Sequence, residues 1–139
     1  MSDLQPPLPQ SDALTVPFWE ACRLGALEVS ACADCGQRFL PPGPCCPRCW
    51  STQLAPHEVS GRGRIFSFAV YRRTYHPATP APYVVALVEL DEGPRLISNI
   101  VGCAPEEVAV DMPVEVRFEE ADDFTLPRFA PVDGGGENP

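Results

Sequence analysis

The sequence predicts a mainly β protein that begins with one short helix, and three observations lead to this prediction. Two Cys-x2-Cys pairs lie close together among turn-forming residues, which is typical of paired hairpins. From residue 59 onward, short runs alternate apolar and polar residues with the period of β-strands. A helix of more than one turn is indicated at one place, just after Thr15. The 139 residues are enough for one ordinary domain or two very small ones.

The N-terminal part predicts a flexible arm over residues 1–14 and a helix over residues 15–26. The arm is rich in proline and contains little apolar material. Thr15 can cap the helix, and a glycine supplies the stop at its other end. Because so short a helix is unstable alone, its apolar residues Phe18 and Trp19 must pack on something. That surface belongs either to the same chain or to a partner.

Residues 27–58 contain the most specific motif of the sequence, two Cys-x2-Cys pairs with ten residues between them. The four cysteines are Cys32, Cys35, Cys46 and Cys49. Each pair can present two thiolates from one tight turn, and together they predict a ribbon that holds a tetrahedral Zn ion. A rubredoxin-type iron site uses the same four sulfurs and is the alternative. Since the protein fills all four positions, one Zn per chain is predicted to be structural.

The other three cysteines have different predicted roles. Cys22 and Cys103 lie in apolar surroundings and are expected in the core. Cys45 adjoins a predicted ligand, but its use would break the two-residue spacing, so its role stays open. The N-terminus lacks the basic start and apolar run of a secretory signal. We therefore expect a cytoplasmic protein whose clustered thiols bind metal, with no membrane contact.

Residues 59–132 predict a small barrel, and the glycine-rich tail 133–139 is predicted to be disordered. The expected strands are residues 64–71, 83–90, 95–101, 112–119 and 126–129, with a single helical turn at 105–108. Five strands with a short helix before the fourth match the Greek-key barrel called the OB-fold in number and size.

The charge pattern limits the partners. All ten cations are Arg, against 19 acidic residues, which gives a net charge of -9. The absence of Lys excludes Schiff-base chemistry, and the acidic balance disfavours binding to nucleic acid. One stretch, residues 61–76, nevertheless holds four Arg and no acid. Its Arg72, Arg73, Tyr75 and His76 suit a small anionic ligand with a ring that can stack. The alternative is a solvated strand face whose Arg residues pair with the acidic C-terminal third.

No arrangement of residues predicts catalysis. The sequence holds two His and no Ser or Cys in a recognisable nucleophile turn. Cys103 is the one residue that could be argued as a nucleophile, and no basic motif lies near it. The sequence therefore predicts a protein that is not itself an enzyme.

These features together resemble a known family of bacterial and archaeal proteins. Its members have an N-terminal helix, a rubredoxin-like zinc ribbon and a C-terminal OB-fold, and they are typically encoded beside thiolases. The resemblance covers about residues 15 to 132. It is carried by Phe18-Trp19, the two Cys pairs with Gly36 and Pro47, Gly61-x-Gly63-x-Ile65, the segment from Pro82 to Gly93, and Leu126-Pro127-x-Phe129. Trp50 departs from the small residue that often follows the second Cys pair.

The resemblance implies a non-catalytic accessory subunit. Such subunits bind and stabilise a thiolase-superfamily partner: a thiolase, an acyltransferase, or an aldolase that shortens steroid side chains. They also help an acyl-CoA substrate reach the shared active site, and the OB-fold is expected to contact the coenzyme A portion. The resemblance supports Cys32, Cys35, Cys46 and Cys49 as zinc ligands and supports no catalytic residue. The alternatives are a nucleic-acid-binding ribbon and OB-fold protein, or, with iron, a rubredoxin-like electron carrier.

Overall fold

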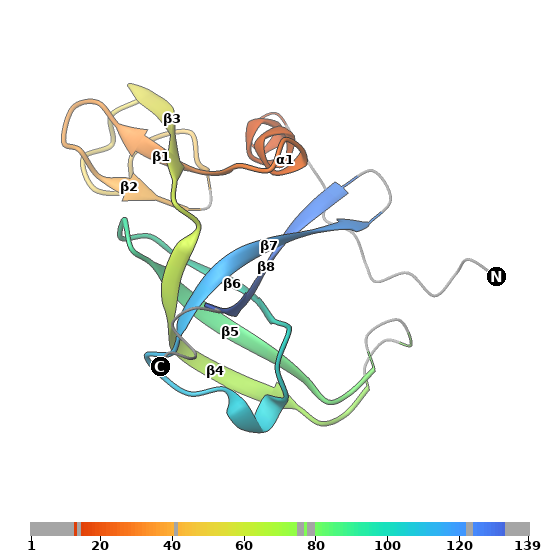
Figure 1. Ribbon diagram of the computed structural model, residues 1–139. Helices are drawn as coiled ribbons and strands as arrows, with labels where there is room; N and C mark the ends of the chain where they lie inside the picture. The colour runs from red at the N-terminus through yellow and green to blue at the C-terminus, as the bar shows by residue number, and fades with distance from the viewer. Residues whose placement is uncertain are drawn as a thin grey trace.

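A computed structural model describes residues 13, 15–40, 42–74, 77, 80–121 and 124–132. The predicted arm, apart from Ala13, and the predicted tail lie outside the described residues. Figure 1 shows the helix and a small sheet at one end of a β-barrel. The predicted fold class, mainly β with one helix, a four-cysteine ribbon and an OB-fold barrel, is confirmed.

Helix α1 spans Val16–Arg23 and is shorter than the predicted helix. The Thr15 carbonyl accepts a hydrogen bond from the Trp19 N–H at 3.1 Å, but the Thr15 side chain does not form the predicted cap. The helix ends because Gly25 adopts a φ of 83°, a left-handed conformation that lets its N–H bond to the Cys22 carbonyl at 2.9 Å. Among the described residues, no helix combines the length and apolar character that a membrane crossing requires.

The ribbon sheet is antiparallel and has the strand order β2-β1-β3. Its strands are β1, Leu27–Cys32; β2, Arg38–Phe39; and β3, Leu54–Val59. The sequence did not predict β3, because Pro56, His57 and Glu58 interrupt the usual alternation. Proline is tolerated here because β3 lies at the edge of its sheet, where an N–H can be dispensed with.

The barrel is closed, with the strand order β4-β5-β6-β8-β7. Its elements are β4, Arg62–Tyr71; β5, Tyr83–Leu90; β6, Arg95–Ile100; the 3-10 turn η1, Pro105–Glu107; β7, Pro113–Ala121; and β8, Phe124–Pro131. Alternate residues of β5, from Val84 to Leu90, are buried, which is the pattern of a strand with one face on a core.

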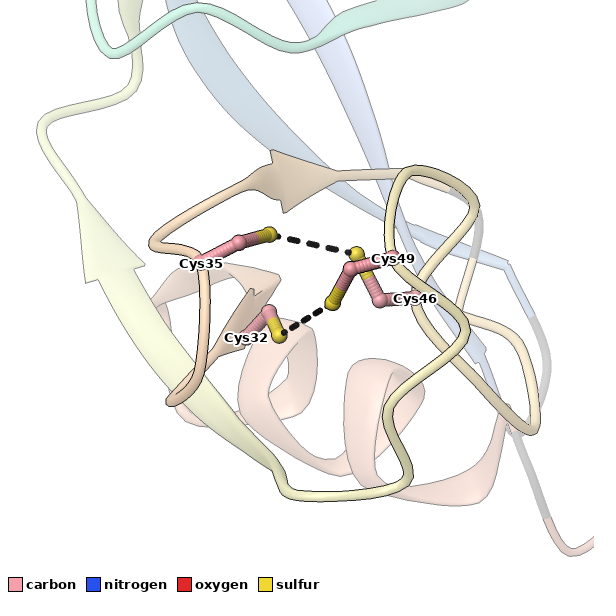
Figure 2. A group of neighbouring side chains, drawn as sticks. All are labelled: Cys32, Cys35, Cys46 and Cys49. Carbon is pink, nitrogen blue, oxygen red and sulfur yellow. Dashed lines mark hydrogen bonds between the residues drawn. The ribbon is translucent and has the colours of Figure 1, made fainter.

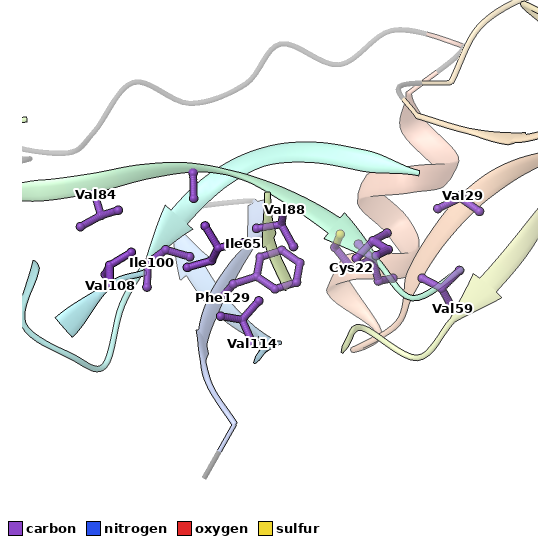
Figure 3. Close-up of a cluster of buried hydrophobic side chains, with 13 residues drawn as sticks. Cys22, Val29, Val59, Ile65, Val84, Val88, Ile100, Val108, Val114 and Phe129 are labelled. Carbon is purple, nitrogen blue, oxygen red and sulfur yellow. The ribbon is translucent and has the colours of Figure 1, made fainter. Parts of the chain in front are cut away.

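One hydrophobic cluster joins the helix, the ribbon and the barrel. Cys22 of α1 and Val59 of β3 belong to the same cluster as Ile65 of β4 and Phe129 of β8 (Figure 3). Only Ser60 and Gly61 separate β3 from β4, so the chain passes almost directly from one sheet to the other (Figure 1).

The barrel closes loosely at one place, between β6 and β8. These strands run parallel and form a single paired position, Ile100 with Phe129. The Val101 N–H donates to the Phe129 carbonyl at 2.8 Å, and the Ser98 hydroxyl donates to the Pro127 carbonyl at 2.7 Å. We call this contact between β6 and β8 the barrel seam.

Candidate functional site

The two Cys-x2-Cys segments form equivalent turns. The Gly36 N–H donates to the Cys32 carbonyl at 2.9 Å, and the Trp50 N–H donates to the Cys46 carbonyl at the same distance. Both residues have positive φ, 80° for Gly36 and 68° for Trp50. Glycine adopts this conformation freely, whereas a tryptophan is strained in it. Trp50 nevertheless forms the same turn as Gly36, and its indole is 77% exposed.

The turns bring four sulfurs together. The Sγ atoms of Cys32, Cys35, Cys46 and Cys49 all lie within 4.8 Å of one another (Figure 2). The Cys32–Cys49 and Cys35–Cys46 sulfur pairs are each 3.6 Å apart. A tetrahedral ion with metal–sulfur bonds of 2.3 Å would space its sulfurs by about 3.8 Å. The described geometry therefore forms a metal site for a thiophilic ion.

The surroundings of the sulfurs favour thiolates. The backbone N–H of Cys35, and then that of Asp34, lower the pKa of Cys32 to about 7 although burial acts against them. Burial also opposes ionisation of Cys46, but the N–H groups of Cys49 and Arg48 outweigh it and lower that pKa too. The Arg48 N–H lies 3.3 Å from the Cys46 sulfur.

Cys49 behaves in the opposite way. The backbone N–H of Ser51 lowers its pKa, but burial and the three neighbouring sulfurs raise it, and the result is about 12. Adjacent thiolates repel one another, so without a cation the last of them keeps its proton. A bound dication removes this penalty, which is why the donor set fits a metal.

Cys22 and Cys103 lie at the hydrophobic core, as the sequence predicted. Cys22 is fully buried, and burial, followed by the charge of Glu28, raises its pKa to about 11. Cys103 packs against the core, and burial raises its pKa as well. Cys45 is half-buried and is not among the four clustered sulfurs.

The Arg-rich strand divides into two parts. Arg64 of β4 lies 2.6 Å from a Glu89 oxygen and also pairs with Asp111, while Arg62 lies 3.9 Å from Glu115. The hydrogen bond from Arg64 holds the pKa of Glu89 below its usual range. For Arg62 and Arg64, the alternative of a solvated, ion-paired strand face therefore applies.

Arg72 and Arg73 are exposed just beyond the end of β4. They follow Tyr71, whose ring stacks on that of Tyr83 with centroids 5.1 Å apart and planes at 21°. Tyr75 and His76 lie outside the described residues. The ligand site predicted at these positions stays a prediction.

A groove of about 760 Å³ lies beside the barrel seam, and the sequence did not predict it. Helix α1, the loop after β2, and strands β5, β6 and β8 form its walls. The lining residues are Thr15, Phe18, Trp19, Leu40, Pro42, Val85, Leu87, Arg95, Leu96, Ile97, Ser98, Asn99, Leu126, Pro127 and Arg128.

The groove shows how the helix packs. Trp19 contacts Phe18 and Phe124 edge-to-face, with ring centroids at 4.9 and 5.4 Å. Helix α1 thus packs on its own chain, the first of the two surfaces that the sequence left open. Phe18 and Trp19 still leave one side facing the groove.

A rubredoxin-like four-cysteine ribbon joined to an OB-fold barrel defines a class of small two-module proteins. Residues 19–55 match the family model for the "ChsH2, rubredoxin-like zinc ribbon domain". Residues 56–119 match the model for the "ChsH2, C-terminal OB-fold domain". The chain therefore belongs to the ChsH2 (DUF35) family, as the sequence motifs indicated.

Curated relatives carry several names. The "Probable enoyl-CoA hydratase alpha subunit" of Thermomonospora curvata is 47% identical over 117 residues, which are 83% of this chain and 37% of that protein. This chain therefore spans less than two fifths of that relative's length. A "DUF35 domain-containing scaffold protein" of Methanothermobacter thermautotrophicus is 41% identical, over 72% of this chain and 80% of its own. The "Benzoylsuccinyl-CoA thiolase subunit BbsA" of Thauera aromatica is 29% identical over 85 residues, 61% of this chain and 58% of that one.

Among solved structures, the chain is similar to one in the "Ltp2-ChsH2(DUF35) aldolase". The TM-score is 0.83 at 42% identity, and the match covers 89% of this chain and 98% of that one. The similarity therefore spans the helix, the ribbon and the barrel together.

Proposed function

We propose that this chain is a non-catalytic accessory subunit that binds and stabilises a thiolase-superfamily partner. The observation that carries the proposal is the 42% identity to ChsH2(DUF35) over 98% of its chain, in a structure that contains Ltp2 as well. Relatives called a scaffold protein and a thiolase subunit support it. The partner in this proposal is a thiolase, an acyltransferase or an aldolase, and it supplies the catalytic residues.

Co-expression tests the proposal directly. We expect a thiolase-superfamily protein encoded beside this chain to elute with it in constant ratio on gel filtration, and to lose solubility or activity when expressed alone. The isolated chain should show no turnover. A neighbouring thiolase-superfamily protein that is fully active and stable without the chain, and does not associate with it, would refute the proposal.

The proposed metal is zinc, held by Cys32, Cys35, Cys46 and Cys49. Zinc would supply folding free energy to the ribbon and no chemistry, since four thiolates leave no open coordination position. Metal analysis and an absorption spectrum of the purified protein distinguish zinc from iron. A red protein with one iron per chain would favour the electron-carrier alternative.

We further propose that the end of β4 and the following loop help to bind the coenzyme A portion of an acyl-CoA. The exposed Arg72 and Arg73 adjoin the stacked Tyr71 and Tyr83 rings, and guanidinium groups suit phosphates. Tyr75 and His76 are included from the sequence pattern alone.

Replacing both Arg72 and Arg73 with Ala tests this site. We expect the complex to bind coenzyme A roughly tenfold or more weakly, because charge-assisted hydrogen bonds are lost. Calorimetric titration measures the change, and Arg62→Ala, at the other end of β4, is the matched control. Equal affinity of the double variant and the native complex would favour a purely solvated loop.

A further inference from the structure

The edge of β6 that faces the barrel seam is only partly used. All six residues of β6, from Arg95 to Ile100, are paired with β5 on one side. On the other side, β8 is paired with β6 only at Ile100. No other pair between described residues of β6 and β8 is formed, and the groove of about 760 Å³ lies against the remaining part of β6.

The ladder with β5 fixes which backbone groups face this groove. The Leu90 N–H donates to the Pro94 carbonyl at 2.9 Å, which starts the ladder. In an antiparallel pair, alternate residues direct their N–H and C=O toward the partner strand. Leu96 and Ser98 therefore direct theirs toward β5, and Arg95 and Ile97 direct theirs toward the seam. No described residue is paired with Arg95 or Ile97 on that side.

The opposite wall cannot accept a strand in the same way. Pro127 of β8 has no N–H, and its carbonyl already accepts the Ser98 hydroxyl. Proline commonly blocks the edge of a β-sheet in this way, whereas an edge strand with free N–H and C=O groups can pair with another strand. The seam is therefore blocked on β8 and open on β6.

The side chains around the open edge are apolar. Ile97 is 73% exposed, an unusual state for isoleucine, and Leu87 lies directly across from it on β5. Phe18, Trp19 and Leu126 line the groove beyond it. An occupant with apolar side chains would cover these surfaces.

The charges at the groove are already balanced. Arg95 lies over the Phe66 ring at 3.8 Å and bonds to Glu89 at 3.3 Å. Arg128 bonds to Glu119 at 3.0 Å and to the Asn99 amide oxygen at 2.6 Å. Charge complementarity therefore favours an occupant that brings no net charge, which disfavours the phosphates of coenzyme A at this place.

We propose that the free edge of β6 receives an extended, apolar strand of the partner subunit, which pairs with the backbone of Arg95 and Ile97. This inference rests on the proposed function and names the surface that the partner would use. An acyl chain would fill the groove but would leave the edge N–H and C=O groups without hydrogen bonds in an apolar contact. A peptide strand fills the apolar groove and also pairs with these N–H and C=O groups, as in other proteins that recognise a partner by adding a strand.

The chain's own N-terminal residues fit this edge less well. Pro6, Pro7 and Pro9 have no N–H to donate, and Asp3 and Asp12 would bring uncompensated negative charge. The proposed partner strand is therefore one without proline or acidic residues at the paired positions.

Amide hydrogen exchange tests the pairing without any substitution. The probe is the labelled chain in complex with the thiolase-superfamily protein that elutes with it. In the free chain, the Leu96 and Ser98 amides should exchange slowly, and the Arg95 and Ile97 amides should exchange fast. In the complex, the Ile97 and Arg95 amides should slow by about tenfold or more, because they become hydrogen-bonded.

A pair of variants at one position separates the backbone from the side chain. Ile97→Pro removes the N–H that faces the seam and leaves the ladder with β5 intact, whereas Ile97→Ala keeps this N–H. We expect Ile97→Pro to weaken the complex by about tenfold more than Ile97→Ala does, because it removes a hydrogen bond and places a ring at the edge. Both variants should keep the metal content of the native chain.

The outcomes distinguish this inference from the proposed function. If no complex forms, the proposed function fails and this inference with it. If the complex forms but the Ile97 amide stays fast and both variants bind equally well, the strand proposal alone is overturned. Slow exchange of Ile97 in the isolated chain, or on addition of an acyl-CoA without the partner, would assign the edge to another occupant and would also overturn it.

Discussion

Replacing Gly63 should destabilise the protein, because the backbone of β5 passes directly over it. It is paired with Leu90, and a Cβ added at Gly63 would lie 2.3 Å from the Glu89 carbonyl oxygen and 3.0 Å from the Leu90 Cα. A carbon and a carbonyl oxygen in contact are normally about 3.3 Å apart or more. Gly63→Ala therefore requires β4 and β5 to separate by about 1 Å, and both contacts are to backbone rather than to a flexible side chain.

The expected loss of stability is about 3 kcal/mol. Overpacking alone costs about 1–3 kcal/mol, and each strand hydrogen bond weakened by the shift adds about 1 kcal/mol. For a chain of this size, the loss lowers Tm by about 10 °C. Thermal and urea unfolding followed by circular dichroism measure it.

Gly43→Ala is the matched control for Gly63→Ala. The nearest atom to a Cβ at Gly43 is 3.8 Å away, so this change should be neutral or slightly stabilising. Equal Tm values for the two variants would refute the close approach of β5 to Gly63.

Two further predictions concern the cysteines. Cys46→Ser should abolish stoichiometric metal binding, and the variant should then no longer bind the partner. Cys103→Ser should keep the metal at a small cost in packing. Equal metal content of the two variants would contradict the ligand assignment. Because burial raises the pKa of Cys22 from 9.0 to about 11, the unfolded chain loses this proton first. The free energy of unfolding is therefore unaffected by ionisation of Cys22 below about pH 9 and falls by roughly 2–3 kcal/mol as the pH rises to about 11. Urea titrations across this range should show the decline in the native chain and a weaker one in Cys22→Ala, and parallel curves would disprove the assignment.

Local signals in the sequence predicted most of the fold. The run from Tyr83 to Leu90 is bounded by a proline and an Asp-Glu-Gly turn, and β5 has these limits. The metal site was equally predictable, because the spacing of the four cysteines brings their sulfurs together. Strand β3 was missed because Pro56 reads as a strand breaker unless its edge position is known.

The groove and the seam could not be predicted in this way. They depend on how α1, β6 and β8 are arranged around the groove, and these elements are far apart in the sequence. The same holds for Arg64, whose partners Glu89 and Asp111 come from distant segments. A count of charges found the Arg-rich strand, but only the tertiary structure shows that Arg64 pairs with these two carboxylates.

The short passage through Ser60 and Gly61 has a consequence for how the chain can be divided. The two family models meet between residues 55 and 56, which falls inside β3, Leu54–Val59. A cut there would split a strand and remove Cys22, Leu27 and Val29 from the cluster that also holds Phe129. The ribbon and the barrel are thus two units of sequence but one unit of folding. An ion bound by the four sulfurs would therefore shift the folding equilibrium of the barrel as well, although all four sulfurs come from the ribbon.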